Sequence, residues 1–146
     1  MIGLLQRVSE ASVSVDGETV GSIGRGLLVL VGVRRSDTLA DALRLTERIL
    51  GYRVFQDDQG RMNLSVSDLG LGLLLVPQFT LAADTRKGRR ASFTGAASPG
   101  AGRECFEILL KQCRDRVPQV QSGIFGAHMQ VALINDGPVT FWLESP

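Results

Sequence analysis

Hydrophobic and polar positions alternate over the first fifteen residues, which is the period of a β-strand. Within residues 2–15, Val8 falls on one face and Arg7 on the other, so the pattern predicts one long strand. Asp16-Gly17 is a strong two-residue hairpin signal, and a short second strand is expected through Val20 and Ile23.

Two runs are hydrophobic without alternation, at residues 27–31 and 73–76. Continuous apolar runs of this length are typical of strands buried on both faces. Residues 52–55, 119–125, 128–135 and 139–144 also have the composition of strands, and Asp57-Asp58-Gln59-Gly60 is expected to form a turn.

The first of two predicted helices starts after Ser36, as N-cap, and ends at Gly51 in a left-handed conformation. Its expected inner face comprises Leu39, Ala42, Leu43, Thr46, Ile49 and Leu50. The second has Ser98 as N-cap and Pro99 as first residue, and Pro118 prevents its extension. Its expected buried stripe is Cys105, Phe106, Leu109, Leu110 and Cys113.

The order of these elements predicts an α+β fold. We expect a mostly antiparallel sheet or open β-barrel with two main helices packed on it. No linker or internal repeat divides the chain, so residues 1–146 are expected to form a single domain.

Composition narrows the class of protein. Hydrophobic residues make up 44% and charged residues 21%, which is typical of a globular protein. The net charge is only +1, so nucleic-acid binding would require local clustering of basic residues. No apolar run approaches the ~20 residues of a membrane span, and residues 1–5 lack the features of a signal peptide. We therefore expect a cytosolic protein.

Few side chains suggest metal or triad chemistry. Cys105 and Cys113 are eight residues apart in one predicted helix, a rise of ~12 Å that no disulfide spans. They are expected to be buried thiols, and no zinc spacing is present. The single histidine, His128, lies in a strand-like run and is expected to be structural or on the surface. No metal or cofactor is expected.

Two short segments stand out. Pro77-Gln78-Phe79-Thr80-Leu81 follows the second buried run, where groups at a strand end become available to a ligand. Gly137-Pro138 lies between two predicted strands, and only an X-Pro bond takes the cis form at low cost. A hairpin turn is the simpler interpretation of Gly137-Pro138 taken alone.

Together these segments resemble the D-aminoacyl-tRNA deacylase family, of the D-tyrosyl-tRNA deacylase type. That family has a Ser-Gln-Phe-Thr-Leu-type motif and an Asn-x-Gly-Pro-Val-Thr motif at about this separation. The resemblance extends over the chain through the segments Leu5-Gln6-Arg7-Val8, Gly26-Leu27-Leu28-Val29-Leu30, Met62-Asn63-Leu64 and Ala82-Ala83-Asp84-Thr85. Position 77, usually Ser in the family, is Pro in this chain.

The resemblance implies a mechanism that rests on the backbone and on the RNA. The 2′-hydroxyl of the terminal adenosine assists ester hydrolysis, and the amides of Phe79 and Thr80, presented with Gln78, polarise the ester carbonyl. The alternative is Thr80 as nucleophile, but a Thr nucleophile needs an adjacent base and none accompanies it in sequence. Pro77 removes one hydroxyl and one N–H from the motif and leaves the two amides.

The same resemblance implies that Gly137-Pro138 is cis and reaches across a homodimer interface into the partner's pocket. Its carbonyls would accept the substrate's ammonium group and fill the space that an L side chain needs. Arg7 matches the residue that braces this pair, although it would serve equally as a solvated strand residue. Phe125 and Met129 are candidates for lining the pocket, and core packing explains them equally well.

Arg86, Lys87, Arg89 and Arg90 form the densest basic cluster, in a Gly-rich stretch from Ala82 to Gly102 that predicts a long functional loop. Such a loop could bind acceptor-stem phosphates, with Phe93 stacking on a terminal base. A solvated surface is the alternative.

The expected protein is a homodimeric hydrolase that releases D-amino acid from D-aminoacyl-tRNA, with glycyl-tRNA as a second substrate. Two alternatives stay open. One is a catalytically silent module that binds the tRNA 3′ end, disabled by Pro77. The other is a structural dimer with no RNA role.

Overall fold

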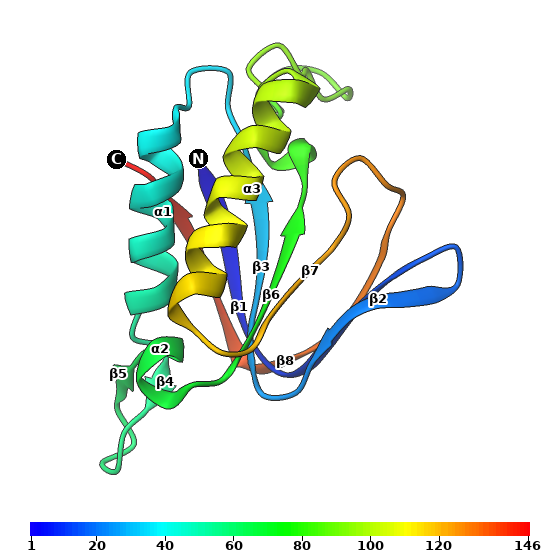
Figure 1. Cartoon of the computed structure of the whole chain (residues 1–146). Coiled ribbons are helices and arrows are strands. Elements are labelled where there is room, and N and C mark those ends of the chain that lie inside the picture. Colours follow the sequence, from blue (N-terminus) through cyan, green and yellow to red (C-terminus); the bar gives the residue numbers. More distant parts are fainter.

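A computed structural model describes all 146 residues and shows an α+β fold built on a strongly curved sheet (Figure 1). The strands are β1 (Ile2–Val15), β2 (Glu18–Ile23), β3 (Gly26–Gly32), β4 (Phe55–Gln56), β5 (Met62–Leu64), β6 (Gly72–Pro77), β7 (Val120–Ser122) and β8 (Gln130–Glu144). The helices are α1 (Leu39–Gly51), α2 (Val66–Leu69), α3 (Pro99–Arg116) and the 3₁₀ helix η1 (Phe79–Ala82).

The long strand β1 organises the main sheet. It pairs antiparallel with β2, β3 and β8, while β3, β6 and β7 run parallel to one another, giving the order β2-β1-β3-β6-β7 with β8 also on β1. The sheet is nearly closed into a barrel, with α1 and α3 side by side on one face (Figure 1). The predicted class, α+β with a mostly antiparallel sheet and two main helices, is confirmed.

The core explains the two continuous apolar runs. β3 and β6 lie in the middle of the sheet, and both of their faces are buried. Leu27 and Leu73 pack under the helices, whereas Leu28 and Leu74 belong to a second cluster on the opposite face. Each fully buried Leu contributes about 1.5–3 kcal/mol relative to an exposed one, so these strands are fixed firmly in place.

Helix α1 differs in detail from its prediction. Its N-cap is Thr38 rather than Ser36, because Thr38 and Asp41 form a reciprocal capping box. Leu39 and Leu43 are 43% and 46% exposed, so the predicted inner face is wrong at both. Gly51 is the last helical residue, and the chain leaves through extended backbone at Tyr52, not through a left-handed glycine.

The C-terminal strands also differ from their prediction. The sequence predicts two strands, at 128–135 and 139–144, but β8 runs without interruption from Gln130 to Glu144. Its pairing with β1 changes register near Val8 and then resumes, so the partner strand holds both halves together. Within 119–125 only Val120–Ser122 are in a strand, and within 52–55 only Phe55 is. The short helix α2 is not predicted by the sequence pattern.

Other predictions are confirmed. Asp16 and Gly17 both have positive φ, as a tight hairpin between β1 and β2 requires. Ser98 caps α3, accepting from the amide of Ala101, and Pro99 is the first helical residue. The predicted loop therefore ends at Ser98 and not at Gly102. Cys105 and Cys113 are free and buried. No helix is long and apolar enough to cross a membrane.

Candidate active site

The first motif is fixed to the middle of the sheet. Pro77 is the last residue of β6 and is buried, and it lies opposite Val31 of β3. The next amide, that of Gln78, donates to the Val31 carbonyl oxygen at 2.7 Å. The hydrogen bonding between β6 and β3 therefore continues one residue beyond Pro77. This fixes the start of the segment Gln78–Leu81 to the sheet.

The chain then turns at once into η1, which begins with Phe79 and Thr80. The first N–H groups of a helix have no partner inside it, and Gln78 makes no side-chain cap bond to them. Phe79 is 61% exposed and Thr80 is exposed. Two backbone donors therefore stand at an open surface directly after a buried strand.

The Thr80 hydroxyl has a different environment from that of a nucleophile. Its Oγ1 accepts a hydrogen bond from Nε2 of Gln78 at 2.9 Å. The amide of Gln78 is not a base, and the single histidine, His128, is exposed and makes no hydrogen bond to Thr80. The geometry therefore favours the motif's backbone over this hydroxyl.

Two cavities meet at Pro77, Phe79 and Gly126, which line both. The smaller cavity, of ≈ 250 Å³, also contains Gln78, Thr80 and Met129. The larger cavity, of ≈ 380 Å³, has the aromatic walls Phe79, Phe93 and Phe125. Phe125 and Met129 are both expected from sequence to line one pocket, and the structure places them in these two adjoining cavities.

Aromatic contacts join the loop after η1 to the motif. The rings of Phe79 and Phe93 are 5.1 Å apart with planes inclined at 52°. The loop is closed by mutual hydrogen bonds between the backbones of Asp84 and Ser92, at 2.8 and 2.9 Å. Phe93, predicted from sequence to contact a base, is therefore held in the wall of the larger cavity.

Met129 is held by the turn that precedes β8. Its Sδ accepts a hydrogen bond from the Ile124 amide at 3.4 Å, and a Cβ at Gly123 would come within 2.7 Å of that sulfur. Glycine at position 123 therefore allows the thioether to reach the cavity.

The basic cluster divides into one paired residue and three free ones. Arg86 donates from Nε and Nη2 to the two carboxylate oxygens of Asp84, at 2.9 and 2.7 Å. These hydrogen bonds hold the pKa of Asp84 well below its usual range, and Arg86 is correspondingly occupied. Lys87, Arg89 and Arg90 are exposed and form no ion pair, so they carry the available charge.

The second motif lies within β8, where the Gly137–Pro138 peptide bond is cis, as predicted. Asn135 closes the segment: its Oδ1 accepts from the Val139 amide at 2.7 Å, and its Nδ2 donates to Thr140 Oγ1 at 2.8 Å and Gln6 Oε1 at 3.1 Å. Gly137 has φ +148°, and a Cβ there would lie 2.7 Å from the Val139 nitrogen.

Arg7 supports the same segment from β1. Its Nε donates to the Asp136 carbonyl oxygen at 2.9 Å and its Nη1 to the Val54 carbonyl oxygen at 2.8 Å. Its side chain is 12% exposed. A solvated strand arginine, the alternative considered from sequence, does not describe this environment.

Within one chain the two motifs remain separate, because Gly137 and Pro138 line neither cavity beside Phe79. Sequence reasoning missed Asn135 and Gln6. Asn135 is the first residue of the second motif, so its position in the motif could have identified it. Its contact with Gln6 could not be predicted, because it depends on the pairing of β1 with β8. No group of three or more His, Cys, Asp or Glu side chains gathers to hold a metal ion.

Comparisons with known proteins place the whole chain in one family. The model of the family described as D-Tyr-tRNA(Tyr) deacylase matches residues 4–144. A protein of Thioalkalivibrio sulfidiphilus named D-aminoacyl-tRNA deacylase is 69% identical over 100% of this chain and 98% of its own length. One of the same name from Alkalilimnicola ehrlichii is 66% identical over 99% and 97%.

Solved structures share the fold. The c-Myc DNA unwinding element binding protein superposes with a TM-score of 0.95 at 40% identity, covering 100% of this chain and 99% of that one. A probable eukaryotic D-amino acid tRNA deacylase superposes with a TM-score of 0.82 at 18% identity, with 98% of each chain covered. The match over residues 4–144 and these identities show that the chain belongs to the D-Tyr-tRNA(Tyr) deacylase family.

Proposed function

We propose that this chain is a D-aminoacyl-tRNA deacylase that hydrolyses the ester between a D-amino acid and the 3′ end of tRNA, and that residues 1–146 form its one catalytic domain. The products are free D-amino acid and reusable tRNA, and glycyl-tRNA is a second substrate because glycine has no side chain to exclude. The activity belongs in the cytoplasm, where aminoacyl-tRNA is made and used.

The observation that supports this proposal is that η1 begins with Phe79, which lines both cavities, and Thr80, which lines the smaller one. Backbone donors fixed before the reaction stabilise a developing oxyanion without reorganising, and removing one such donor typically costs about 2.7–4 kcal/mol. The aminoacyl group occupies the smaller cavity and the terminal adenosine the larger, aromatic one. The terminal 2′-hydroxyl assists hydrolysis, since no protein base adjoins the site.

Selection of the D-enantiomer requires a second copy of the chain. Gly137 and Pro138 are exposed and line neither cavity of their own chain, so a partner chain brings them to the site. There the carbonyls accept the substrate's ammonium group and occupy the space of an L side chain. Arg7 and Asn135 hold the pair rigid through the hydrogen bonds described above.

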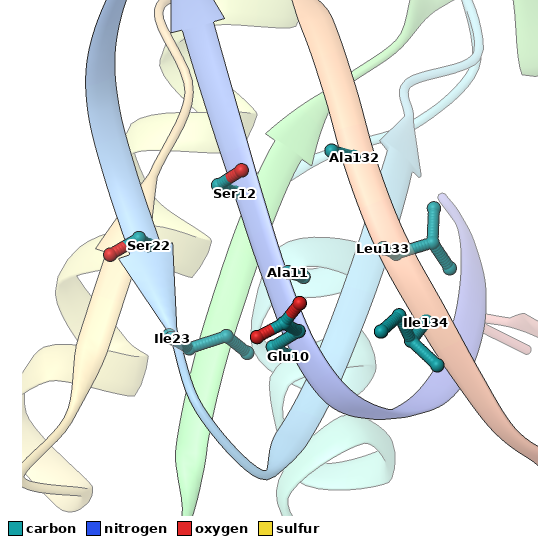
Figure 2. Close-up of a pocket in the computed structure, with 8 residues that line it drawn as sticks. All are labelled: Glu10, Ala11, Ser12, Ser22, Ile23, Ala132, Leu133 and Ile134. Atoms are coloured by element: carbon teal, nitrogen blue, oxygen red, sulfur yellow. The ribbon is translucent and has the colours of Figure 1, made fainter.

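The outer face of β1, β2 and β8 offers a surface for that partner. A cavity of ≈ 330 Å³ lies there. Figure 2 shows the residues that line it, with Ser12 between Ser22 and Ala132, and Glu10 opposite Ile134. The lining combines the small side chains of Ser12, Ser22 and Ala132 with larger ones, of which Ile134 is 55% exposed. Gly137 follows Ile134 by three residues in β8, so a copy packed on this face lies beside the Gly-Pro pair. Two-fold pairing would give each subunit its partner's pair.

The tRNA acceptor stem lies along the loop after η1. Lys87, Arg89 and Arg90 supply the charge for its phosphates, and Phe93 contributes a face for stacking on the terminal base. The net charge of +1 is compatible with this because the free cations are gathered at one place.

The decisive assay measures hydrolysis of matched D- and L-aminoacyl-tRNA, and of a D-substrate with a terminal 2′-deoxyribose. We expect cleavage of the D-substrate alone, and a loss of several orders of magnitude on 2′-deoxy substitution. Thr80→Ala should retain substantial activity because its amide remains. A loss of three or more orders of magnitude, about 4 kcal/mol or more, would assign catalysis to the Thr80 hydroxyl instead.

The dimer is tested by Ile134→Glu, which should give monomers in sedimentation velocity and abolish deacylation. Leu43→Glu, at a comparably exposed apolar position on α1, is the matched control and should change neither property. A monomeric variant with full activity would exclude a shared site.

A catalytically silent module for the tRNA 3′ end is the second candidate, favoured by one observation: Pro77 stands where the family has Ser, between the two cavities. Retained tRNA binding with no cleavage of the D-substrate would select this module.

A further inference from the structure

Arg103, on the fifth residue of α3, packs against the wall of the larger cavity. Its Cζ lies 4.9 Å from the centroid of the Phe125 ring, which lines that cavity. Gly102 permits the arrangement, because a Cβ there would come within 3.3 Å of Cζ of Phe125. The ring therefore packs close to the helix backbone, with a guanidinium against it.

This cation is not neutralised by the protein. Arg103 is exposed and makes no ion pair, although Glu107 lies one turn further along the same helix. The spacing itself allows pairing on α3, since Lys111 and Asp115, also four residues apart, are joined at 2.8 Å. Arg103 instead lies on an aromatic ring, where the guanidinium gains cation–π attraction and keeps N–H groups free for a ligand.

The position of this free cation matches a feature of the substrate. An apolar cavity walled by three phenylalanine rings suits a nucleobase. The terminal nucleoside of RNA is joined to the preceding nucleotide by an anionic phosphodiester, which must leave the cavity at its rim. We propose that Arg103 binds this phosphodiester and so recognises the RNA strand beyond the terminal nucleoside. The inference rests on the proposed function and assigns a substrate-binding residue to that same site.

The test separates a phosphate contact from support of the Phe125 ring. Competition against deacylation compares two probes, adenosine and the dinucleotide cytidylyl-(3′,5′)-adenosine, for wild type, Arg103→Ala and Arg103→Met. One charged hydrogen bond corresponds to about tenfold in affinity. We expect both variants to bind the dinucleotide about tenfold more weakly and adenosine unchanged. With D-aminoacyl-tRNA as substrate, the KM of Arg103→Ala and Arg103→Met should rise by a similar factor while kcat stays constant. Arg103→Lys, which keeps a cation, should show a smaller rise in KM.

Arg114→Ala is the matched control, because Arg114 is exposed on the same helix and also unpaired. It should affect neither probe. Equal weakening of adenosine and dinucleotide would show that Arg103 only supports Phe125, and unchanged binding of both would exclude any role. Each result overturns the inference while deacylation by the wild type leaves the proposed function intact. If the wild type cleaves no D-aminoacyl-tRNA, the proposed function fails, and direct binding of the same two probes to the same variants then decides the role of Arg103.

Discussion

The guanidinium of Arg7 joins the Asp136 carbonyl, at 2.9 Å, to the Val54 carbonyl, at 2.8 Å. Asp136 directly precedes Gly137, and Val54 directly precedes β4. One largely buried side chain on β1 therefore fixes the backbone that presents the Gly-Pro pair. Both hydrogen-bond acceptors are backbone carbonyls, and the Asp136 carboxylate adds an ion pair with Arg7 Nε at 3.6 Å.

Arg7→Lys should lower kcat/KM for D-aminoacyl-tRNA by about tenfold or more, because an ammonium group lacks the planar fork that reaches both carbonyls. Each charged hydrogen bond contributes about 1.5–3 kcal/mol, and part of that loss is expected in the melting temperature. Steady-state kinetics on both enantiomers would check this. Arg53→Lys is the control and should behave as wild type, because Arg53 is exposed and its side chain donates a hydrogen bond only to Asn63.

Asn135 allows its acceptor and donor roles to be separated. Asn135→Asp keeps the oxygen that accepts from the Val139 amide and loses the donors to Thr140 and Gln6, whereas Asn135→Ala loses both. We expect Asn135→Ala to be the more destabilised by about 1–3 kcal/mol, because it leaves the Val139 amide without its partner. Denaturant unfolding measures the difference. Equal stabilities would mean that the Val139 bond does not hold the segment.

The pairing of Arg86 with Asp84 predicts unequal effects within the basic cluster. Arg86→Gln should leave the salt dependence of tRNA binding nearly unchanged. Replacing Lys87, Arg89 and Arg90 together by Gln should reduce the slope of log K against log salt by about 0.7–0.9 for each RNA phosphate that the variant no longer neutralises. Binding titrations at several salt concentrations give the slopes. Identical slopes for the two variants would show that the ion pair with Asp84 does not prevent Arg86 from binding RNA phosphates.

Most of the secondary structure was predictable because its signals are local. The alternation in β1, the continuous apolar runs of β3 and β6, and the Ser98-Pro99 start of α3 each follow from a few neighbouring residues. The start of α1 was mispredicted although a signal existed. Ser36 and Thr38 can both cap a helix, but only Thr38 has an acid three residues later, at Asp41, to complete the capping box.

The remaining errors concern interactions between distant segments. Asn-Asp-Gly-Pro has a turn composition, yet pairing with β1 along both sides keeps β8 a single strand. The Arg7 brace joins residues separated by 129 positions, which no local pattern encodes. The motif at 77–81 was identified by resemblance, but the division of its surroundings into two cavities depends on the loops that hold Phe93 and Phe125.

Burial raises the pKa of the Cys113 thiol from 9.0 to about 12. Because the folded-state pKa is above the unfolded value, this thiol contributes stability that is present below pH 9 and is lost as the pH rises toward 12. In that window stability should fall by up to about 1.4 kcal/mol per pH unit on this account. Cys113→Ala should be less stable at neutral pH but show a shallower alkaline decline. Parallel pH profiles for the two proteins would contradict the assignment.

Pro77 is compatible with its place in β6 because the strand is unpaired on one side there. β7 pairs with β6 only from Leu73 to Leu75, and the bond to β3 that follows comes from the Gln78 amide. The missing N–H of Pro77 therefore removes no hydrogen bond between strands. Sheets tolerate proline at positions of this kind, where the N–H has no partner strand. Its fixed φ also restricts the unfolded chain, so Pro77→Ser should destabilise the protein by about 0.4–1 kcal/mol.

The rate of Pro77→Ser decides whether this chain is a full enzyme. If the amides of Phe79 and Thr80 carry the reaction, a hydroxyl at position 77 is not needed, and kcat should stay within about tenfold, or 1.4 kcal/mol. Pro77→Ala is the matched variant, because it restores the N–H without the hydroxyl. A gain well beyond tenfold in the Ser variant but not in the Ala variant would assign the hydroxyl a catalytic role. In that case the binding module disabled by Pro77 would become the better description of this chain.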